Sequence, residues 1–389
     1  MTMSINRMKI MVLLIILAPI FSGSARDIIL LSIFTIAAWM ALQHFNKIHF
    51  TLNRKTNNVV FALFIISTLL ICYSIINAVV NGLSFGVLAR LLQLYTAFAV
   101  LIATSQYQWR MSDYVFLQCI IRTIVLIALL LWPFSGYKTN YYAAMYGHGN
   151  GLGGVMFCCT GILLMNPSKQ TLLNKLTFLS VLLLLYFSNN RSALASFLLF
   201  AFLRIVFFHF EGLRYKWLFR IVVFIFTLFP VFYMALYYSE FRSSIDAFSW
   251  FFLRKRFFSG RQYIWGEILS LIQNKLWIGY GLEVTPESIS ITEGLSSHSW
   301  YLQTLLQMGI IGFVLIIKCL ADVWRYLYRY RNFVVCRNTS AFLLGVLLWQ
   351  CFEVSITQNN FSQGILVWLI LGMGINKYFI ANVNEETVT

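Results

Sequence analysis

The chain has 389 residues, of which 60% are hydrophobic and only 11% are charged, with a net charge of +16. A soluble globular protein carries about 45–50% apolar and about 25% charged residues, and a disordered chain is poor in hydrophobic residues, so this composition excludes both classes. It predicts an all-α integral membrane protein, in which Lys and Arg gather in cytoplasmic loops without any nucleic-acid partner.

A helix needs about 20 apolar residues to cross the ~30 Å hydrocarbon core, and about 12 segments meet this requirement. They are residues 8–23, 27–43, 58–77, 86–104, 114–134, 149–165, 174–188, 192–208, 220–238, 300–320, 340–356 and 364–380. The polar segment 239–298 separates the ninth from the tenth. We therefore expect one polytopic membrane domain over residues 1–389, with 239–298 as a long loop inserted between helices 9 and 10.

The basic residues predict the orientation of the chain. With a cytoplasmic N-terminus, about eighteen Lys and Arg residues fall in cytoplasmic segments and about four in short extracytoplasmic ones, as the positive-inside rule requires. Both termini are then cytoplasmic and the long loop is extracytoplasmic. An alternative for the N-terminus is a cleavable signal peptide, because Arg7 and Lys9 precede an apolar run that ends in small residues at 22–25.

Two arginines on the predicted extracytoplasmic side are candidate anion ligands. Arg191 lies in a short connection between two apolar helices, where an interface anchor that extends toward the headgroups is the alternative role. Arg261 follows Ser259 and Gly260, either of which can cap a predicted helix, so its guanidinium would lie at a helix N-terminus. The preceding Arg254, Lys255 and Arg256 are candidate ligands too, although attraction to anionic lipid headgroups is the better explanation for these three residues.

Two histidines are predicted on the same side of the membrane. His298 lies where the chain re-enters the membrane and is a candidate general base, with a solvated loop histidine as the alternative. His148 and Asn150 lie in a Gly-rich entry to the sixth helix, which allows close approach of a ligand or of a neighbouring helix. For these two residues we keep both a substrate-binding and a structural role.

Arg90 and Arg122 interrupt apolar runs. Arg90 lies about one turn from the extracytoplasmic end of its helix, within reach of an anionic headgroup. For Arg122 we expect a packing role with a buried partner, for which Glu353 is a candidate.

Several signatures of common enzyme sites are absent from the sequence: metal-ligand spacing, an Asp-x-Asp pair in an extracytoplasmic loop, a nucleotide-binding loop and a Gly-x-Ser-x-Gly elbow. The seven cysteines show no pairing pattern. We therefore expect a cofactor-free, metal-free reaction. Arginines would stabilise a diphosphate leaving group, and the histidine would deprotonate an attacking hydroxyl.

The motifs in residues 145–315 resemble those of the O-antigen ligase/polymerase superfamily. They are Gly149-Asn150-Gly151-Leu152-Gly153, Ser188 to Ser192, Ser259-Gly260-Arg261 with Trp265, Asn274, Trp277-Ile278-Gly279-Tyr280-Gly281-Leu282, His298-Ser299-Trp300-Tyr301-Leu302 and Met308-Gly309-Ile310-Ile311-Gly312. Ser299 departs from the pattern, because the family often has Asn there.

The resemblance implies a metal-independent GT-C-like glycosyltransferase of the bacterial inner membrane. Its donor would be an undecaprenyl-diphosphate-linked glycan, with Arg191 and Arg261 binding the diphosphate and His298 as the base. Its further partners would be membrane lipids and a chain-length regulator or other polysaccharide-assembly proteins. The modest loop favours a polymerase of lipid-linked repeat units over an O-antigen ligase that uses lipid A-core. A lipid-linked oligosaccharide flippase is the alternative from another class, although the half-to-half symmetry of many transporters is not visible.

Overall fold

The computed structural model describes residues 2–48, 58–134, 141–166, 171–209, 215–253, 256–258, 260–289, 296–358 and 361–388. Within these ranges the structure is helical and has no strand. The helices are α1 (Thr2–Leu17), α2 (Gly23–Ile48), α3 (Asn58–Asn81), α4 (Phe85–Gln106), α5 (Met111–Leu131), α6 (Gly149–Leu163), α7 (Leu172–Phe187), α8 (Arg191–His209), α9 (Leu218–Tyr237), α10 (Arg242–Leu253), α11 (Arg261–Asn274), α12 (Trp300–Arg329), α13 (Val334–Trp349), α14 (Phe361–Gly374) and α15 (Lys377–Val388). Short 3-10 helices η1 (Ala18–Ile20), η2 (Trp132–Phe134) and η3 (Pro286–Ile289) lie between them.

In the described part of the chain, 7 helices are long and apolar enough to cross a membrane, and these are α2, α3, α4, α5, α8, α9 and α12. The pair α14 and α15, bent by 66°, would make an eighth span. Helices α6, α7 and α13 are apolar but shorter. The chain is therefore a multi-pass helical membrane protein, while the expected number of about 12 spans stays a prediction.

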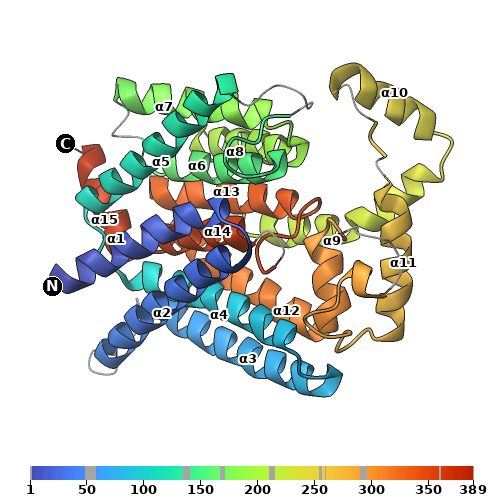
Figure 1. Cartoon of the computed structure of the whole chain (residues 1–389). Coiled ribbons are helices and arrows are strands. Elements are labelled where there is room, and N and C mark those ends of the chain that lie inside the picture. Colours follow the sequence, from blue (N-terminus) through green and yellow to red (C-terminus); the bar gives the residue numbers. More distant parts are fainter. Residues whose placement is uncertain are drawn as a thin grey trace.

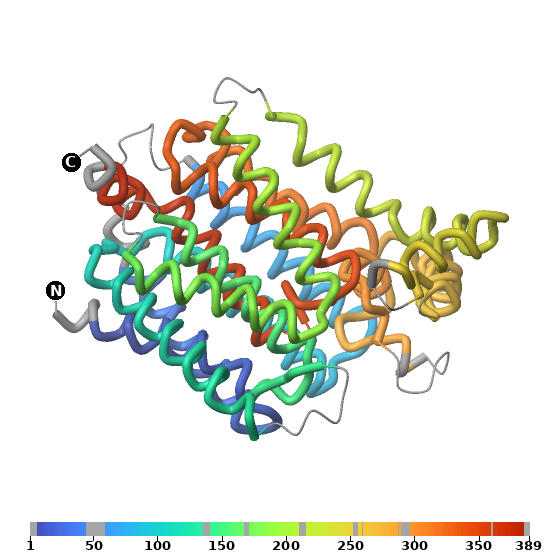
Figure 2. Tube along the Cα trace, turned by 90° about the horizontal axis from the view of Figure 1, so that it is seen from above, coloured from blue at the N-terminus to red at the C-terminus, as the bar shows by residue number. Residues whose placement is uncertain are grey.

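The two termini lie at one end of the helical bundle, and α10 and α11 lie at the opposite end (Figures 1 and 2). The segment 239–298, expected to be an extracytoplasmic loop, contains these two helices together with η3. This arrangement fits the predicted topology, which requires the termini and the long loop on opposite sides of the membrane.

The bundle is built around α6, α13 and α14, whose side chains are almost all buried. Aromatic packing joins the core to its neighbours: the ring of Phe157 in α6 stacks on Phe342 in α13, and Phe200 in α8 meets the same ring edge-on. By contrast, outer helices expose large apolar residues such as Phe202 and Ile205. An exposed apolar surface of this kind is what a helix needs where it faces lipid.

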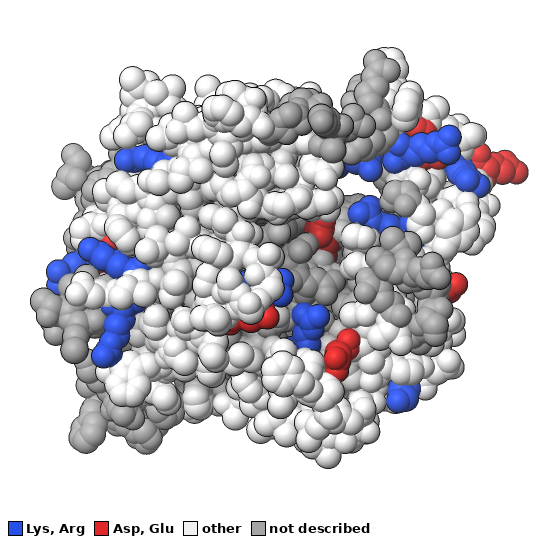
Figure 3. All heavy atoms as spheres, in the orientation of Figure 1, with Lys and Arg blue, Asp and Glu red and all other residues white. Residues whose placement is uncertain are grey.

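On the face shown in Figure 3, charged side chains lie at both ends of the molecule and also in its middle. Some are near the end that carries the termini and others near α10 and α11, and basic and acidic groups lie close together between these ends.

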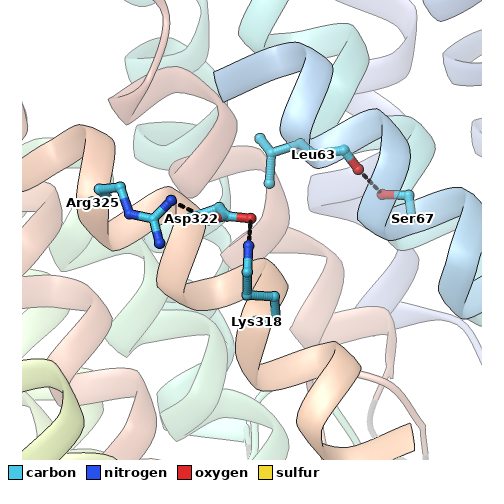
Figure 4. Close-up of polar contacts among 5 residues, drawn as sticks. All are labelled: Leu63, Ser67, Lys318, Asp322 and Arg325. Carbon is cyan, nitrogen blue, oxygen red and sulfur yellow. Dashed lines mark hydrogen bonds and ion pairs between the residues drawn. The ribbon is translucent and has the colours of Figure 1, made fainter. Parts of the chain in front are cut away.

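Ionisable residues inside the bundle have nearby polar partners. In α12 the buried Asp322 pairs with Lys318 at 2.5 Å and with Arg325 at 3.1 Å (Figure 4). The Arg122 guanidinium donates to the Oδ1 of Asn174 in α7, whereas Glu353, the candidate partner, lies near Arg261. A side-chain amide from the neighbouring helix therefore binds this arginine, although its buried Nε has no hydrogen-bond partner among the described residues.

Candidate functional site

The entrance to α6 packs tightly against the turn between α7 and α8. A Cβ atom on Gly149 would collide with the carbonyl oxygen of Ser188, and one on Gly153 would collide with Asn190. The Asn190 side chain donates to the backbone oxygen of Asn150 at 3.2 Å. The glycines of this segment thus permit the close approach of a neighbouring helix, as expected for small residues in a membrane.

The same turn places Arg191 at the start of α8. The Oδ1 of Asn190 accepts the backbone N–H of Ala193 at 3.0 Å and therefore caps the helix. Arg191 is the first helical residue, and its Nη1 donates to the backbone oxygen of Arg256 at 3.3 Å. The guanidinium therefore contacts the polar segment 239–298, which the sequence alone does not indicate.

The segment 256–258 is held from two further sides. The Oδ1 of Asp246 in α10 accepts the backbone N–H groups of Phe257 and Phe258 at 2.9 and 3.1 Å, and the hydroxyl of Tyr233 donates to the oxygen of Phe257 at 3.0 Å. The Arg256 side chain itself is exposed. Arg254 lies outside the described residues.

Arg261 is the first residue of α11, as the capping argument predicts. Its N-cap, Gly260, has a φ of 89°, a left-handed conformation that glycine adopts without strain. The guanidinium lies over the ring of Phe352 at 5.5 Å, and its Nε is buried without a hydrogen-bond partner among the described residues. Burial lowers the pKa of Arg261, while the charge of the neighbouring Glu353 opposes that effect.

The two Gly-containing motifs that follow Arg261 pack against each other. Gly309 has a φ of 60° and interrupts the regular geometry of α12. Beside it, the backbone N–H groups of Ile310 and Ile311 donate to Leu276 and Trp277 at 2.9 and 3.3 Å. A Cβ atom on Gly309 would collide with the oxygen of Trp277. This junction fixes the C-terminal end of α11 on α12.

His298 is held in the short segment before α12. The indole of Trp265 in α11 donates to the oxygen of Ser297 at 2.7 Å, and the backbone N–H of Trp300 donates to Gln350 at 2.9 Å. His298 has a φ of 47°, which is uncommon for a residue with a Cβ atom. Such strain is typical of positions that the surrounding structure holds for a function.

A cavity of about 560 Å³ brings four of the expected residues together. Arg90, His148, Asn150 and His298 all line it, together with the buried Glu353. Its other lining residues are Tyr146, Gly151, Thr285, Pro286, Ser296, Gln303, Val354 and Gln363. The polar groups from α4, α6, the η3–α12 segment and the α13–α14 turn therefore converge on one volume, large enough to take a ligand.

The environment keeps the His298 ring neutral. Burial, then the charge of Arg261 and then that of His148, lower the pKa of His298 from 6.5 to about 4. Arg261 and Arg191 do not line the cavity, but the charge of Arg261 acts on the ring that does. A neutral imidazole can accept a proton, which is the property a general base needs.

His148 has a structural contact as well as a place in the cavity wall. It is the N-cap of α6, and its Nδ1 accepts the backbone N–H of Asn150 at 3.1 Å. Its ring also packs on Tyr141, with 4.9 Å between the centroids. Both roles that the sequence left open for His148 therefore have support.

The sequence argument did not single out Glu353, Tyr146 or Gln303 as site residues. Glu353 had a usable signal, because an acidic residue beside an apolar segment is a candidate for function. Tyr146 and Gln303 had none, since both look like ordinary residues of an apolar helix or its flank. Among the described residues, no group of three or more His, Cys, Asp or Glu side chains is placed to hold a metal ion.

Comparison with known proteins identifies a family for part of the chain. Residues 176–317 match the family model described as O-antigen ligase. The match assigns this part of the chain to the O-antigen ligase/polymerase superfamily and confirms the resemblance. It indicates a glycosyltransferase-like enzyme with lipid-linked glycan substrates. No curated protein matches the chain.

Proposed function

We propose that this chain, like other enzymes of the O-antigen ligase/polymerase superfamily, joins glycans at the extracytoplasmic face of the inner membrane. The favoured reaction is polymerisation of repeat units from an undecaprenyl-diphosphate donor without a metal ion or cofactor. One observation carries the proposal. A strained, neutral His298 shares a cavity of about 560 Å³ with Arg90 and lies within the electrostatic reach of Arg261.

In the proposed reaction, His298 accepts the proton of an acceptor hydroxyl as its oxygen attacks the anomeric carbon of the donor. The bond from that carbon to the diphosphate breaks, and the lipid diphosphate leaves with the bonding electrons. Arg191 and Arg261 stabilise the negative charge that develops on it, as preorganised cations do in a site that excludes water. Arg90, His148 and Asn150 contribute to binding from the cavity wall.

The low pKa of His298 is consistent with this order of events. Without a donor, burial and then the charge of Arg261 lower the pKa of His298 and keep the ring neutral. A bound diphosphate would offset that positive charge, and the imidazolium that forms during transfer would then be less disfavoured. Donor binding thus increases the basicity of His298 at the stage where a base is needed.

Ligation to lipid A-core is the second candidate, because the matching family model is described as O-antigen ligase. Membrane vesicles that contain the purified protein separate the two activities. We expect lipid-linked repeat units alone to give longer lipid-linked chains with release of undecaprenyl diphosphate. Product that forms only after addition of lipid A-core would show a ligase. Movement of lipid-linked glycan across the vesicle without bond formation would show a transporter, and would contradict the proposal.

A further inference from the structure

Two buried side chains in the cavity wall have polar atoms with no hydrogen-bond partner among the described residues. The hydroxyl of Tyr146 and the Oε1 of Gln303 are both in this condition, although their side chains are 8% and 0% exposed. A buried polar group that lacks a partner loses hydration without compensation. Both residues line the cavity of His298, so a ligand in that cavity can supply the missing partners.

The two residues come from different parts of the fold. Tyr146 precedes the Gly-rich entrance of α6, and Gln303 lies in the first turn of α12. The Nε2 of Gln303 donates to the oxygen of Val284 at 2.8 Å, which leaves its Oε1 as an acceptor. The Tyr146 hydroxyl supplies a donor. Asn150 and Gln363 add further uncharged polar groups to the wall.

We propose that Tyr146 and Gln303 form a subsite for the hydroxyl groups of a sugar ring, beside the cationic groups proposed to bind diphosphate. Neutral donors and acceptors match the hydroxyls of a carbohydrate, each of which can donate and accept a hydrogen bond. A charged group is not needed at such a subsite. This inference rests on the proposed function, because it names the part of the substrate that this wall of the cavity recognises.

In polymerisation the donor and the acceptor are both lipid-linked repeat units, and binding measurements separate what their sugar contributes from what their diphosphate contributes. One probe is undecaprenyl diphosphate without sugar. The other is the lipid-linked oligosaccharide extracted from host cells in which the gene for this chain is deleted. The ratio of the two dissociation constants reports what the sugar contributes to binding in the purified, detergent-solubilised protein.

The main variant is Tyr146→Phe, which removes only the unpartnered hydroxyl. We expect its thermal stability to stay at the wild-type value. Affinity for the sugar-bearing lipid should fall about 2–10-fold, the loss of one neutral hydrogen bond, while affinity for undecaprenyl diphosphate stays unchanged. The control is Tyr301→Phe, whose buried hydroxyl donates to the oxygen of Leu347 at 3.0 Å outside the cavity wall. It should lower the thermal stability and leave both affinities unchanged.

A second pair of variants tests the other side of the subsite. Gln303→Met and Gln307→Met each remove a side-chain hydrogen bond to Val284, at 2.8 and 2.7 Å. Gln307 does not line the cavity, and its Oε1 accepts from Gln358. Only Gln303→Met should therefore weaken binding of the sugar.

The outcomes are distinct. A loss of affinity for the sugar-bearing lipid, with unchanged affinity for undecaprenyl diphosphate, supports the subsite. With lipid A-core as the acceptor, unchanged affinity for the lipid-linked donor and a raised KM for lipid A-core would instead assign the subsite to the acceptor. If Tyr146→Phe and Gln303→Met change neither quantity, water alone occupies this wall and the inference is wrong. If the wild-type protein binds neither lipid and transfers no glycan, the proposed function itself has failed.

Discussion

Replacement of His298 tests the proposed chemistry most directly. The His298→Asn variant is preferable to His298→Ala, because Asn tolerates the φ of 47° at this position better than Ala does. Asn keeps a side chain that forms hydrogen bonds but cannot take the proton from a sugar hydroxyl. General-base catalysis contributes about 10²–10⁴-fold, or about 3–5 kcal/mol of barrier, so transfer should fall by that factor while donor binding remains.

The pH dependence of the rate gives a second measure of the same role. With a pKa of about 4, His298 is neutral at pH 7 and becomes protonated only as the pH falls toward 4. The value of kcat/KM for wild-type protein in vesicles should therefore stay level from pH 7 to about 5.5 and fall below that. This acidic limb should be absent from the residual activity of His298→Asn. A limb near pH 6.5 would show that the ring is not buried beside Arg261 as described.

His148 provides the control, since it lines the same cavity. His148→Ala removes the N-cap of α6, at a cost to stability of about 1 kcal/mol, and should weaken substrate binding, but it should retain most of the transfer rate at saturating substrate. If His148→Ala abolishes transfer and His298→Asn does not, the base has been assigned to the wrong histidine. If both variants are fully active, general-base catalysis is refuted, and stabilisation of the leaving diphosphate must account for the rate.

Three further outcomes are expected. Arg191→Lys and Arg261→Lys should impair transfer nearly as much as the Ala variants, because lysine does not offer two parallel donors to a phosphate. If the protein with Lys at both positions makes products of wild-type length, bidentate binding of the diphosphate is excluded. EDTA should leave the rate unchanged, and complete loss that magnesium restores would overturn the metal-free mechanism. Gly309→Ala should lower the free energy of unfolding by at least about 1–3 kcal/mol, because the φ of this residue is 60° and a Cβ atom would collide with the backbone oxygen of Trp277. Thermal unfolding measures this loss. The control is Gly266→Ala inside α11. A Cβ atom there would lie 3.7 Å from the sulfur of Met234, an ordinary contact, so this variant should be neutral or stabilising.

Properties that depend on local sequence were predictable. Hydropathy identified the apolar segments, because the energy of a residue in lipid depends mainly on its own side chain. The Ser-Gly-Arg sequence at 259–261 predicted the start of α11, since capping involves only neighbouring residues. The candidate roles of Arg90, His148, Asn150 and His298 also rested on local signals, and these four residues do line one cavity.

Properties that depend on which helices meet were decided by the tertiary structure. Hydropathy treats all faces of an apolar helix alike, so it cannot select Asn174 over Glu353 as the partner of Arg122. The contact between Arg191 and the backbone of Arg256 joins groups 65 residues apart in sequence. It depends on the fold of the segment 256–258, which Asp246 and Tyr233 hold in place beside the start of α8. Likewise, only the folded chain places Glu353 beside Arg261 and leaves polar atoms of Tyr146 and Gln303 without a hydrogen-bond partner among the described residues in the wall of the cavity.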